Sequence, residues 1–199
     1  MFAKETYTTR RNSLKKRGDR FLAILDNGES GDYADNTYHF RQGSTSLYFW
    51  DLPYAGLAIW ISYCMDGIQP ALCEKAQRVG VTETRPAADL KKYLEKAVAK
   101  RQVIHYLPVY RAEHRLKLLD WLDIKLGMEQ PSVPFIRGVV NMRNYKTAEE
   151  LVEIERACNV TADMHITAMK VLRPGMYEYE VVAEMNRVAE SNNCELSFA

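Results

Sequence analysis

The sequence predicts an α/β domain with a partly parallel sheet, followed by a helical segment. Three short apolar runs, bounded by turn residues or proline, have the length and composition of buried strands. Longer amphipathic segments lie among them, and strands that alternate with helices of this length are typical of layered α/β domains. The predicted strands are 21–25, 55–61 and 103–107, and the predicted helices are 4–17, 70–79, 86–100 and 112–126.

The composition predicts a folded core and excludes several classes of protein. The 199 residues are 47% hydrophobic and 27% charged, which is ordinary for a globular protein and argues against disorder. The formal net charge is +1, so no charge excess indicates a nucleic-acid or membrane partner. No apolar run is long enough to span a bilayer, and the N-terminus has no signal-peptide pattern. We therefore expect a cytoplasmic protein with reduced, mostly buried cysteines at positions Cys64, Cys73, Cys158 and Cys194.

The first predicted helix carries Tyr7 and Leu14 on one face and many cations on the other. Such a cluster indicates either a nucleic-acid patch or a solvated helix face. We interpret it as a solvated face, because the rest of the chain balances the charge. The cations are Arg10, Arg11, Lys15, Lys16 and Arg17.

We place a domain boundary near Asn141, so that the expected domains are residues 1–140 and 141–199. The residues around this boundary, 130–145, are expected to form a connector that includes a short helix. Thr147 and Glu150 then have the spacing of a capping box, which predicts the start of a long helix.

In this long helix, a continuous buried stripe is predicted by residues that recur at steps of three and four. His165 falls within the stripe, and we interpret it as a satisfied core histidine rather than a metal ligand. The stripe consists of Leu151, Ile154, Cys158, Thr161, His165, Ala168 and Leu172. A second helix, 178–189, is expected to turn inward the side chains of Val181, Val182, Met185 and Val188.

The chemically densest stretch is 32–52, which mixes aromatic rings with charged and amide side chains. No period of 2 or 3.6 runs through it, so we predict an ordered loop that leads into a buried turn. Long ordered loops of this kind often carry function. The alternative is a small aromatic core beneath the loop, with Asp35 and Arg41 as a structural pair.

Two motifs, at 38–49 and 165–178, resemble Xaa-Pro aminopeptidases (aminopeptidase P), of the creatinase/prolidase group. The first, Tyr38-x-Phe40-Arg41-Gln42-x-Ser44-x-x-x-Tyr48-Phe49, is similar to the N-terminal domain of this family. The second, His165-x-x-x-Met169-x-x-x-Arg173-Pro174-Gly175-Met176-x-Glu178, is similar to the opening of its "pita-bread" catalytic domain.

The resemblance implies a three-layer N-terminal domain with a mixed sheet, followed by the first two helices of an incomplete catalytic domain. At 62–69, where the family normally has a further strand, the likeness is interrupted. One strand element is therefore expected to be missing.

The resemblance also implies a manganese-dependent peptidase that removes an N-terminal residue preceding proline. Two manganese ions activate a bridging hydroxide in the family, and their ligands are two aspartates, a histidine and two glutamates of the catalytic domain. None of the four histidines here has a metal-site spacing with carboxylates. We therefore expect this chain to hold no metal, to be inactive alone, and to be a truncated part of the enzyme.

Three residues are candidates for a substrate-facing or subunit-interface surface: Asp35, Tyr38 and Arg41. In the family, the N-terminal domain reaches the active site of a neighbouring subunit, and Asp35 matches an acidic residue there. The implied partners are peptides with proline at position two and further copies of the chain. No catalytic residue is assigned.

Two other interpretations remain open. The chain is alternatively a non-catalytic module of aminopeptidase-like fold that binds peptides or proteins, or that drives oligomerisation. It is also compatible with a general α/β ligand-binding domain, because fold does not fix function.

Overall fold

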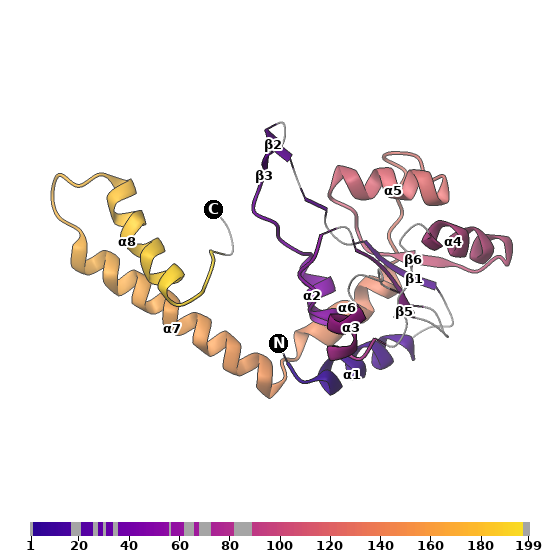
Figure 1. The fold of residues 1–199 in the computed structure, drawn as a ribbon, viewed down its shortest axis with the longest axis horizontal. Coiled ribbons are helices and arrows are strands. Elements are labelled where there is room, and N and C mark those ends of the chain that lie inside the picture. The colour runs from indigo at the N-terminus through magenta and orange to yellow at the C-terminus, as the bar shows by residue number, and fades with distance from the viewer. Residues whose placement is uncertain are drawn as a thin grey trace. The chain divides into compact units, whose positions relative to one another are not determined.

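The computed structural model describes residues 2–16, 21–25, 28–29, 31–33, 36–55, 57–61, 66–67, 73–81 and 89–196. The chain divides into two compact units, Met1–Asn144 and Tyr145–Ala199 (Figure 1). Helix α6 (Val133–Asn144) ends the first unit and occupies most of the predicted connector. The boundary that the sequence predicts after residue 140 falls inside this helix.

The first unit contains a four-stranded sheet with strand order β5-β4-β1-β6. Strand β1 (Phe21–Leu25) pairs in parallel with β6 (Ile104–Tyr106) and antiparallel with β4 (Ala58–Ile61). The sheet is therefore mixed, as the sequence predicts. The short β5 (Asp66–Gly67) pairs with β4 at the edge. The sequence predicts that a strand is missing at 62–69. Within this range the structure describes only residues 66–67, which form β5, so the absence of a strand stays a prediction.

The predicted helices of the first unit are present with shorter bounds. They are α1 (Lys4–Lys15), α3 (Cys73–Arg78), α4 (Asp89–Ala99) and α5 (Ala112–Leu122). Helix α5 stops earlier than predicted because Asp123 takes a left-handed conformation. The Asp123 N–H donates to the Leu119 carbonyl at 3.0 Å, and the Ile124 N–H donates to the Leu118 carbonyl at 3.4 Å. Figure 1 shows α4 and α5 on one side of the strands and α1 on the other.

The stretch at 32–52 was predicted as an ordered loop that leads into a buried turn, and the structure corrects this prediction, because regular elements lie on both sides of residues 38–43. Strands β2 (Gly31–Tyr33) and β3 (Asn36–Thr37) pair as a separate two-stranded sheet, and helix α2 (Ser44–Trp50) follows. A helix of two turns is too short to establish a period, and its aromatic residues have low helix propensity.

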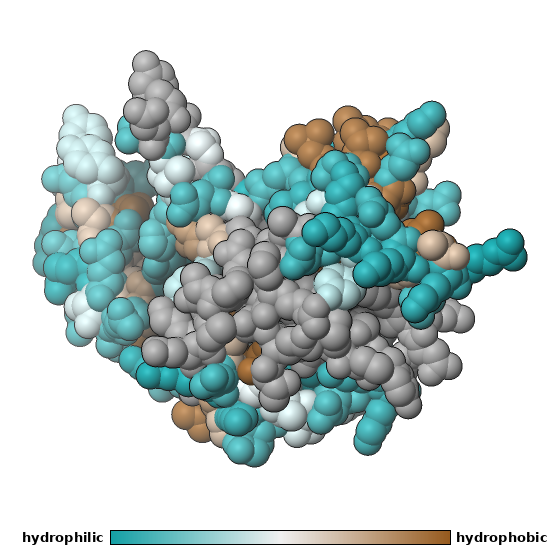
Figure 2. Space-filling view, turned by 45° about the vertical axis from the view of Figure 1, so that its right-hand side comes forward, coloured by the Kyte–Doolittle hydropathy of each residue, from teal (hydrophilic) through white to brown (hydrophobic). Residues whose placement is uncertain are grey.

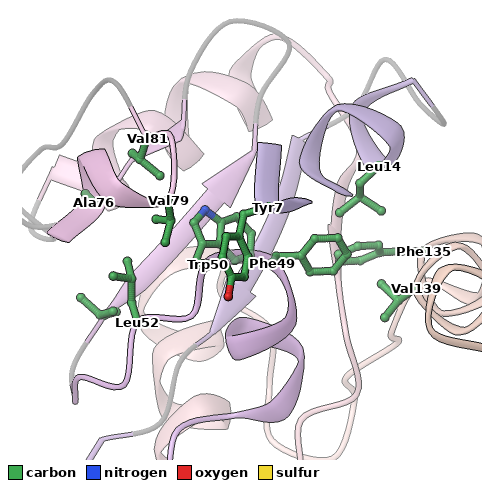
Figure 3. Close-up of a cluster of buried hydrophobic side chains, with 11 residues drawn as sticks. Tyr7, Leu14, Phe49, Trp50, Leu52, Ala76, Val79, Val81, Phe135 and Val139 are labelled. Carbon is green, nitrogen blue, oxygen red and sulfur yellow. The ribbon is translucent and has the colours of Figure 1, made fainter. Parts of the chain in front are cut away.

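The aromatic residues of α2 belong to the main core rather than to a small cluster beneath a loop. Phe49 and Trp50 are fully buried and pack with side chains of α1, α6 and the segment around α3 (Figure 3). The cluster comprises Tyr7, Leu14, Phe49, Trp50, Leu52, Leu57, Ala76, Val79, Val81, Phe135 and Val139. A second, smaller cluster joins α4 to β6 and α5 through Leu90, Leu94 and Ala97.

Arg10 and Arg11 of α1 are buried, which corrects the prediction that they lie on a solvated face. The Arg11 guanidinium donates to the Phe49 carbonyl at 2.9 Å and to the Val79 carbonyl at 2.6 Å. Arg10 donates to the Tyr48 carbonyl at 2.8 Å and lies over the Tyr48 ring. The two arginines thus bind carbonyls at the end of α2, where a helix leaves acceptors unpaired and favours cations.

The second unit is a helical hairpin of α7 (Ala148–Val171) and α8 (Glu178–Ser191). The predicted capping box at its start is confirmed. The Glu150 N–H donates to Thr147 Oγ1 at 3.3 Å, and the Thr147 N–H donates to Glu150 Oε2 at 2.9 Å. Gly175, at φ +89°, lies in the turn between the helices, where a left-handed residue is required.

The predicted buried stripe of α7 is wrong, because most of its members are exposed. The α7 side chains that are buried are Val160 and Met164, which pack against Ala189 of α8. His165 and Cys158 are exposed, so His165 is not a core histidine and Cys158 is not a buried thiol. Cys194 is half-buried, and the side chains of Cys64 and Cys73 lie outside the description. The exposed apolar members of the stripe are Leu151, Ile154 and Leu172.

Apolar side chains are also exposed on the first unit. Figure 2 shows hydrophobic residues gathered at the upper right of one face of the molecule. Leu116 and Leu119 of α5 and Leu126 beyond it are exposed. Within the described ranges, no helix combines the length and the hydropathy that a membrane crossing requires.

Candidate functional site

Two of the three predicted surface residues, Tyr38 and Arg41, lie in the segment 38–41, between the β2–β3 hairpin and α2. Tyr38 is 60% exposed, and Arg41 is also exposed. His39 is exposed between them, and Phe40 is half-buried. Asp35 lies outside the described residues, so the suggested Asp35–Arg41 pair stays a prediction. The segment presents an aromatic ring and a guanidinium to solvent on a backbone that is fixed at its end.

Gln42 anchors this segment to the domain. Its side chain is buried, and its amide nitrogen donates to the Tyr54 carbonyl at 2.8 Å. Its amide oxygen accepts from the Gly43 N–H at 2.8 Å. One side chain therefore ties the end of the exposed segment to the chain that leaves α2. Sequence reasoning missed this role, since a lone glutamine before a short helix has no distinctive pattern.

A hydrogen-bond chain holds the other end of α2. The Tyr7 hydroxyl donates to Asp51 Oδ2 at 2.8 Å and accepts from the Phe2 N–H at 2.9 Å. Burial raises the pKa of Tyr7 to about 12, and the hydrogen bond to Asp51 acts in the same direction. The hydroxyl therefore stays protonated at neutral pH and can donate. Together with Arg10 and Arg11, this chain fixes the helix that carries the motif.

A charged cluster holds the chain that enters the hairpin. Glu113 of α5 accepts from the Gly28 N–H at 2.7 Å and from Arg111 Nε at 3.0 Å. Burial raises the pKa of Glu113, but the Gly28 N–H and the Arg111 guanidinium outweigh it, so the pKa is lowered overall. Glu113 is therefore ionised near neutral pH. The cluster is structural, because its charges satisfy one another and a backbone amide.

The described residues do not fit the metal site that the resemblance implies. Among them, no three histidine, cysteine, aspartate or glutamate side chains gather in a way that could hold a metal ion. The carboxylates that begin α7, Glu149 and Glu150, belong to the first turn of the helix and its capping box. No metal-dependent step is derived for these residues.

The arrangement described above is shared with known proteins. No protein-family model matches the chain. A stretch of 51 residues, 25% of this chain, is 43% identical to the Xaa-Pro aminopeptidase of Escherichia coli (strain K12) and covers 12% of that protein.

Solved structures match nearly the whole chain. An alanine-substituted aminopeptidase P from Escherichia coli has a TM-score of 0.79 at 20% identity, over 96% of this chain and 50% of that one. PepP, an aminopeptidase of Pseudomonas aeruginosa, has a TM-score of 0.78 at 20% identity over the same shares. A putative aminopeptidase P from Bacillus anthracis has a TM-score of 0.77 at 13% identity, over 98% of this chain and 53% of that one.

The chain has the aminopeptidase P fold. The resemblance predicted from the two motifs is thus confirmed, and the match extends to both units of the chain, because 96% of the residues are covered. The chain spans about half the length of the aminopeptidase P structures that it matches. At 20% identity or below, these structures establish the fold, and the short local match is what points to the Xaa-Pro aminopeptidase in sequence.

Proposed function

We propose that this chain forms the N-terminal portion of a manganese-dependent Xaa-Pro aminopeptidase, which removes an N-terminal residue that precedes proline. The observation that carries the proposal is the match of 96% of the chain to aminopeptidase P at a TM-score of 0.79. The stretch that is 43% identical to an Xaa-Pro aminopeptidase supports it. In this proposal, the first unit is the three-layer N-terminal domain, and α7 and α8 are the first helices of the pita-bread domain.

The role of these residues in the proposal is to position substrate and subunits rather than to perform the hydrolysis. In the family, two manganese ions supply the activated hydroxide, and another part of the protein binds them. A related solved structure, the zinc-substituted aminopeptidase P of Escherichia coli in complex with product, has a TM-score of 0.76. The anchored segment 38–41, with Tyr38 and Arg41 exposed, is suited to reach a neighbouring subunit in a homo-oligomer.

Asp35, Tyr38 and Arg41 are the proposed contacts of this surface. A carboxylate at the entrance of the site would hold the α-amino group of the peptide through a charge-assisted hydrogen bond. Such a contact selects substrates with a free N-terminus. Tyr38 and Arg41 offer a ring and a guanidinium, which are the side chains most enriched where protein surfaces meet.

The first test measures X-Pro hydrolysis by the 199-residue chain and by a chimera. In the chimera, residues 1–144 replace the corresponding domain of the Escherichia coli Xaa-Pro aminopeptidase. We expect the chain alone to show no stoichiometric manganese binding by calorimetry and no turnover, and the manganese-loaded chimera to cleave. An inactive chimera that folds and assembles like the parent enzyme, or an active isolated chain, contradicts the proposal. The first outcome would instead favour the non-catalytic binding module.

The second test concerns Asp35. In the active chimera, Asp35→Ala is expected to lower kcat/KM by about 10- to 150-fold, the equivalent of one hydrogen bond to a charged group. Asn36→Ala is the matched control, because Asn36 is an exposed neighbour in β3. Equal activity of the two variants, with the oligomeric state unchanged, would assign Asp35 a structural role.

A further inference from the structure

A cavity of about 450 Å³ opens in the first unit, and Gly43 is the first residue along the chain that lines it. Its walls come from the start of α2, the segment after β6, α5 and α6. The volume lies within the usual range for sites of small ligands. The apolar wall is formed by Leu107, Pro108, Val109, Ile136, Val139 and Val140.

The cavity lies where ligands bind in other α/β proteins. Strands β1 and β6 are parallel, so their carboxyl ends share one edge of the sheet. The lining segment 107–110 follows directly from the carboxyl end of β6. In open α/β sheets, small ligands bind in the crevice at this edge. The position therefore favours a ligand site over a packing defect.

One end of the cavity is cationic and rich in hydroxyl groups. Arg143 lies in the last turn of α6. Its Nη1 atom donates to Ser44 Oγ and to Thr45 Oγ1, each at 3.4 Å. These are long contacts, and a carboxylate oxygen is a stronger acceptor for a guanidinium than a hydroxyl oxygen. None of the described residues that line the cavity is acidic. This end therefore favours an anion.

The walls at this end are tied together. Tyr48 of α2 donates its hydroxyl proton to the Met142 carbonyl of α6 at 3.1 Å, and the Arg143 guanidinium lies 5.8 Å from the centre of the Tyr48 ring. Both contacts fix Arg143 relative to α2. A guanidinium that is held in place loses less conformational entropy when it binds a carboxylate.

Ser46 provides an independent observation. Ser46 is one of the residues that line the cavity. It is 1% exposed, and its hydroxyl is buried without a hydrogen-bond partner in the structure. Buried hydroxyl groups are nearly always paired, and each exception calls for an explanation. A polar ligand atom in the cavity would satisfy this group.

We propose that this cavity binds a small organic carboxylate with an apolar body. The carboxylate would accept hydrogen bonds from Arg143 and from the hydroxyl groups of Ser44 and Ser46, and the body would pack against the wall of α6 and the segment 107–110. A guanidinium matches the two oxygens of a carboxylate, and the apolar wall excludes a bare inorganic anion. The carboxylate of a short peptide and that of an aliphatic acid share this chemistry.

The test is calorimetric titration of the 199-residue chain with hexanoate and with N-acetyl-leucine. Saturable binding of either acid is expected. Tighter binding of N-acetyl-leucine would indicate a peptide carboxylate as the ligand, and tighter binding of hexanoate would indicate an aliphatic acid. Hexanamide and N-acetyl-leucinamide, which lack the charge, are expected to bind at least about tenfold more weakly. Equal binding of acid and amide, binding of neither acid, or displacement of the acid by an equal concentration of inorganic phosphate overturns the proposal.

Two variants and one control locate the binding site. Arg143→Gln is expected to weaken binding of the acid by about tenfold or more, while Arg137→Gln, an exposed position on the same helix, leaves it unchanged. Ser46→Ala is expected to weaken binding about threefold to tenfold without lowering the unfolding midpoint, because it removes an unpaired hydroxyl. Equal losses in Arg143→Gln and Arg137→Gln, or undiminished binding in Ser46→Ala, contradict the assignment.

Discussion

Replacement of Arg11 by methionine is expected to lower the free energy of unfolding of the first unit by about 2–5 kcal/mol. Arg11 is 1% exposed and donates to the carbonyls of Phe49 and Val79, so the substitution leaves two acceptors without a donor. A hydrogen bond to a charged group is worth about 1.5–3 kcal/mol, and part of this is offset because methionine preserves the packing of the aliphatic stem.

Urea unfolding followed by tryptophan fluorescence provides the measurement, because Trp50 lies in the same core cluster. Lys16→Met is the matched control, since it removes one cation from the exposed end of the same helix. Its cost should stay below about 1 kcal/mol, the usual size of a helix-dipole interaction. A loss in Arg11→Met no larger than in Lys16→Met would show that the buried guanidinium does not stabilise α2.

The burial of Arg10 and Arg11 shows why the sequence alone misplaced them. The two arginines were predicted to lie with Lys15 and Lys16 because they are charged. A helical period gives only the angle of a side chain around its own helix, and by that angle Arg10 and Arg11 share the face of Tyr7 and Leu14. It does not reveal what the neighbouring element offers. Here the neighbour is the end of α2, whose backbone carbonyls need donors, and a guanidinium with several N–H groups satisfies them. Such a partner is defined by the tertiary structure.

Features that depend only on nearby residues were predicted correctly, because they need no partner from the tertiary structure. The capping box of Thr147 and Glu150 depends on residues three apart and is confirmed. The buried stripe of α7 depends on what packs against it, and in the structure the helix buries Val160 and Met164 instead. The strands β1, β4 and β6 were found as apolar runs, but their parallel and antiparallel pairing needed the structure.

Of the two candidate sites, the one within a linear motif was predicted from the sequence, and the one built by distant helices was not. Tyr38 and Arg41 were identified through a resemblance in a linear motif, and the structure places both on an exposed segment. The cavity was missed because Ser46 and Arg143 lie on helices far apart in the sequence. Neither residue has a pattern around it that indicates a ligand.

The second unit should be the less stable part of the chain. Its described core consists of Val160, Met164 and Ala189, and burying this little apolar surface barely offsets the entropy of ordering two helices. Amides of α7 and α8 are therefore expected to exchange hydrogen faster than those of Ile104–Tyr106 in β6. Hydrogen exchange read by mass spectrometry compares the two regions, and sedimentation velocity establishes whether the sample is monomeric.

Met164→Ala is expected to unfold the hairpin while leaving the unfolding midpoint of the first unit unchanged. Truncation of a buried methionine costs about 2–5 kcal/mol, which is comparable with the whole stability of a hairpin with so small a core. Met169→Ala is the matched control, because Met169 is 77% exposed on the same helix. If α7 and α8 of monomeric Met164→Ala exchange as slowly as Ile104–Tyr106, the hairpin has a source of stability outside this core. If protection in the parent chain instead rises with protein concentration, the exposed side chains of Leu151, Ile154 and Leu172 are the surface through which copies associate.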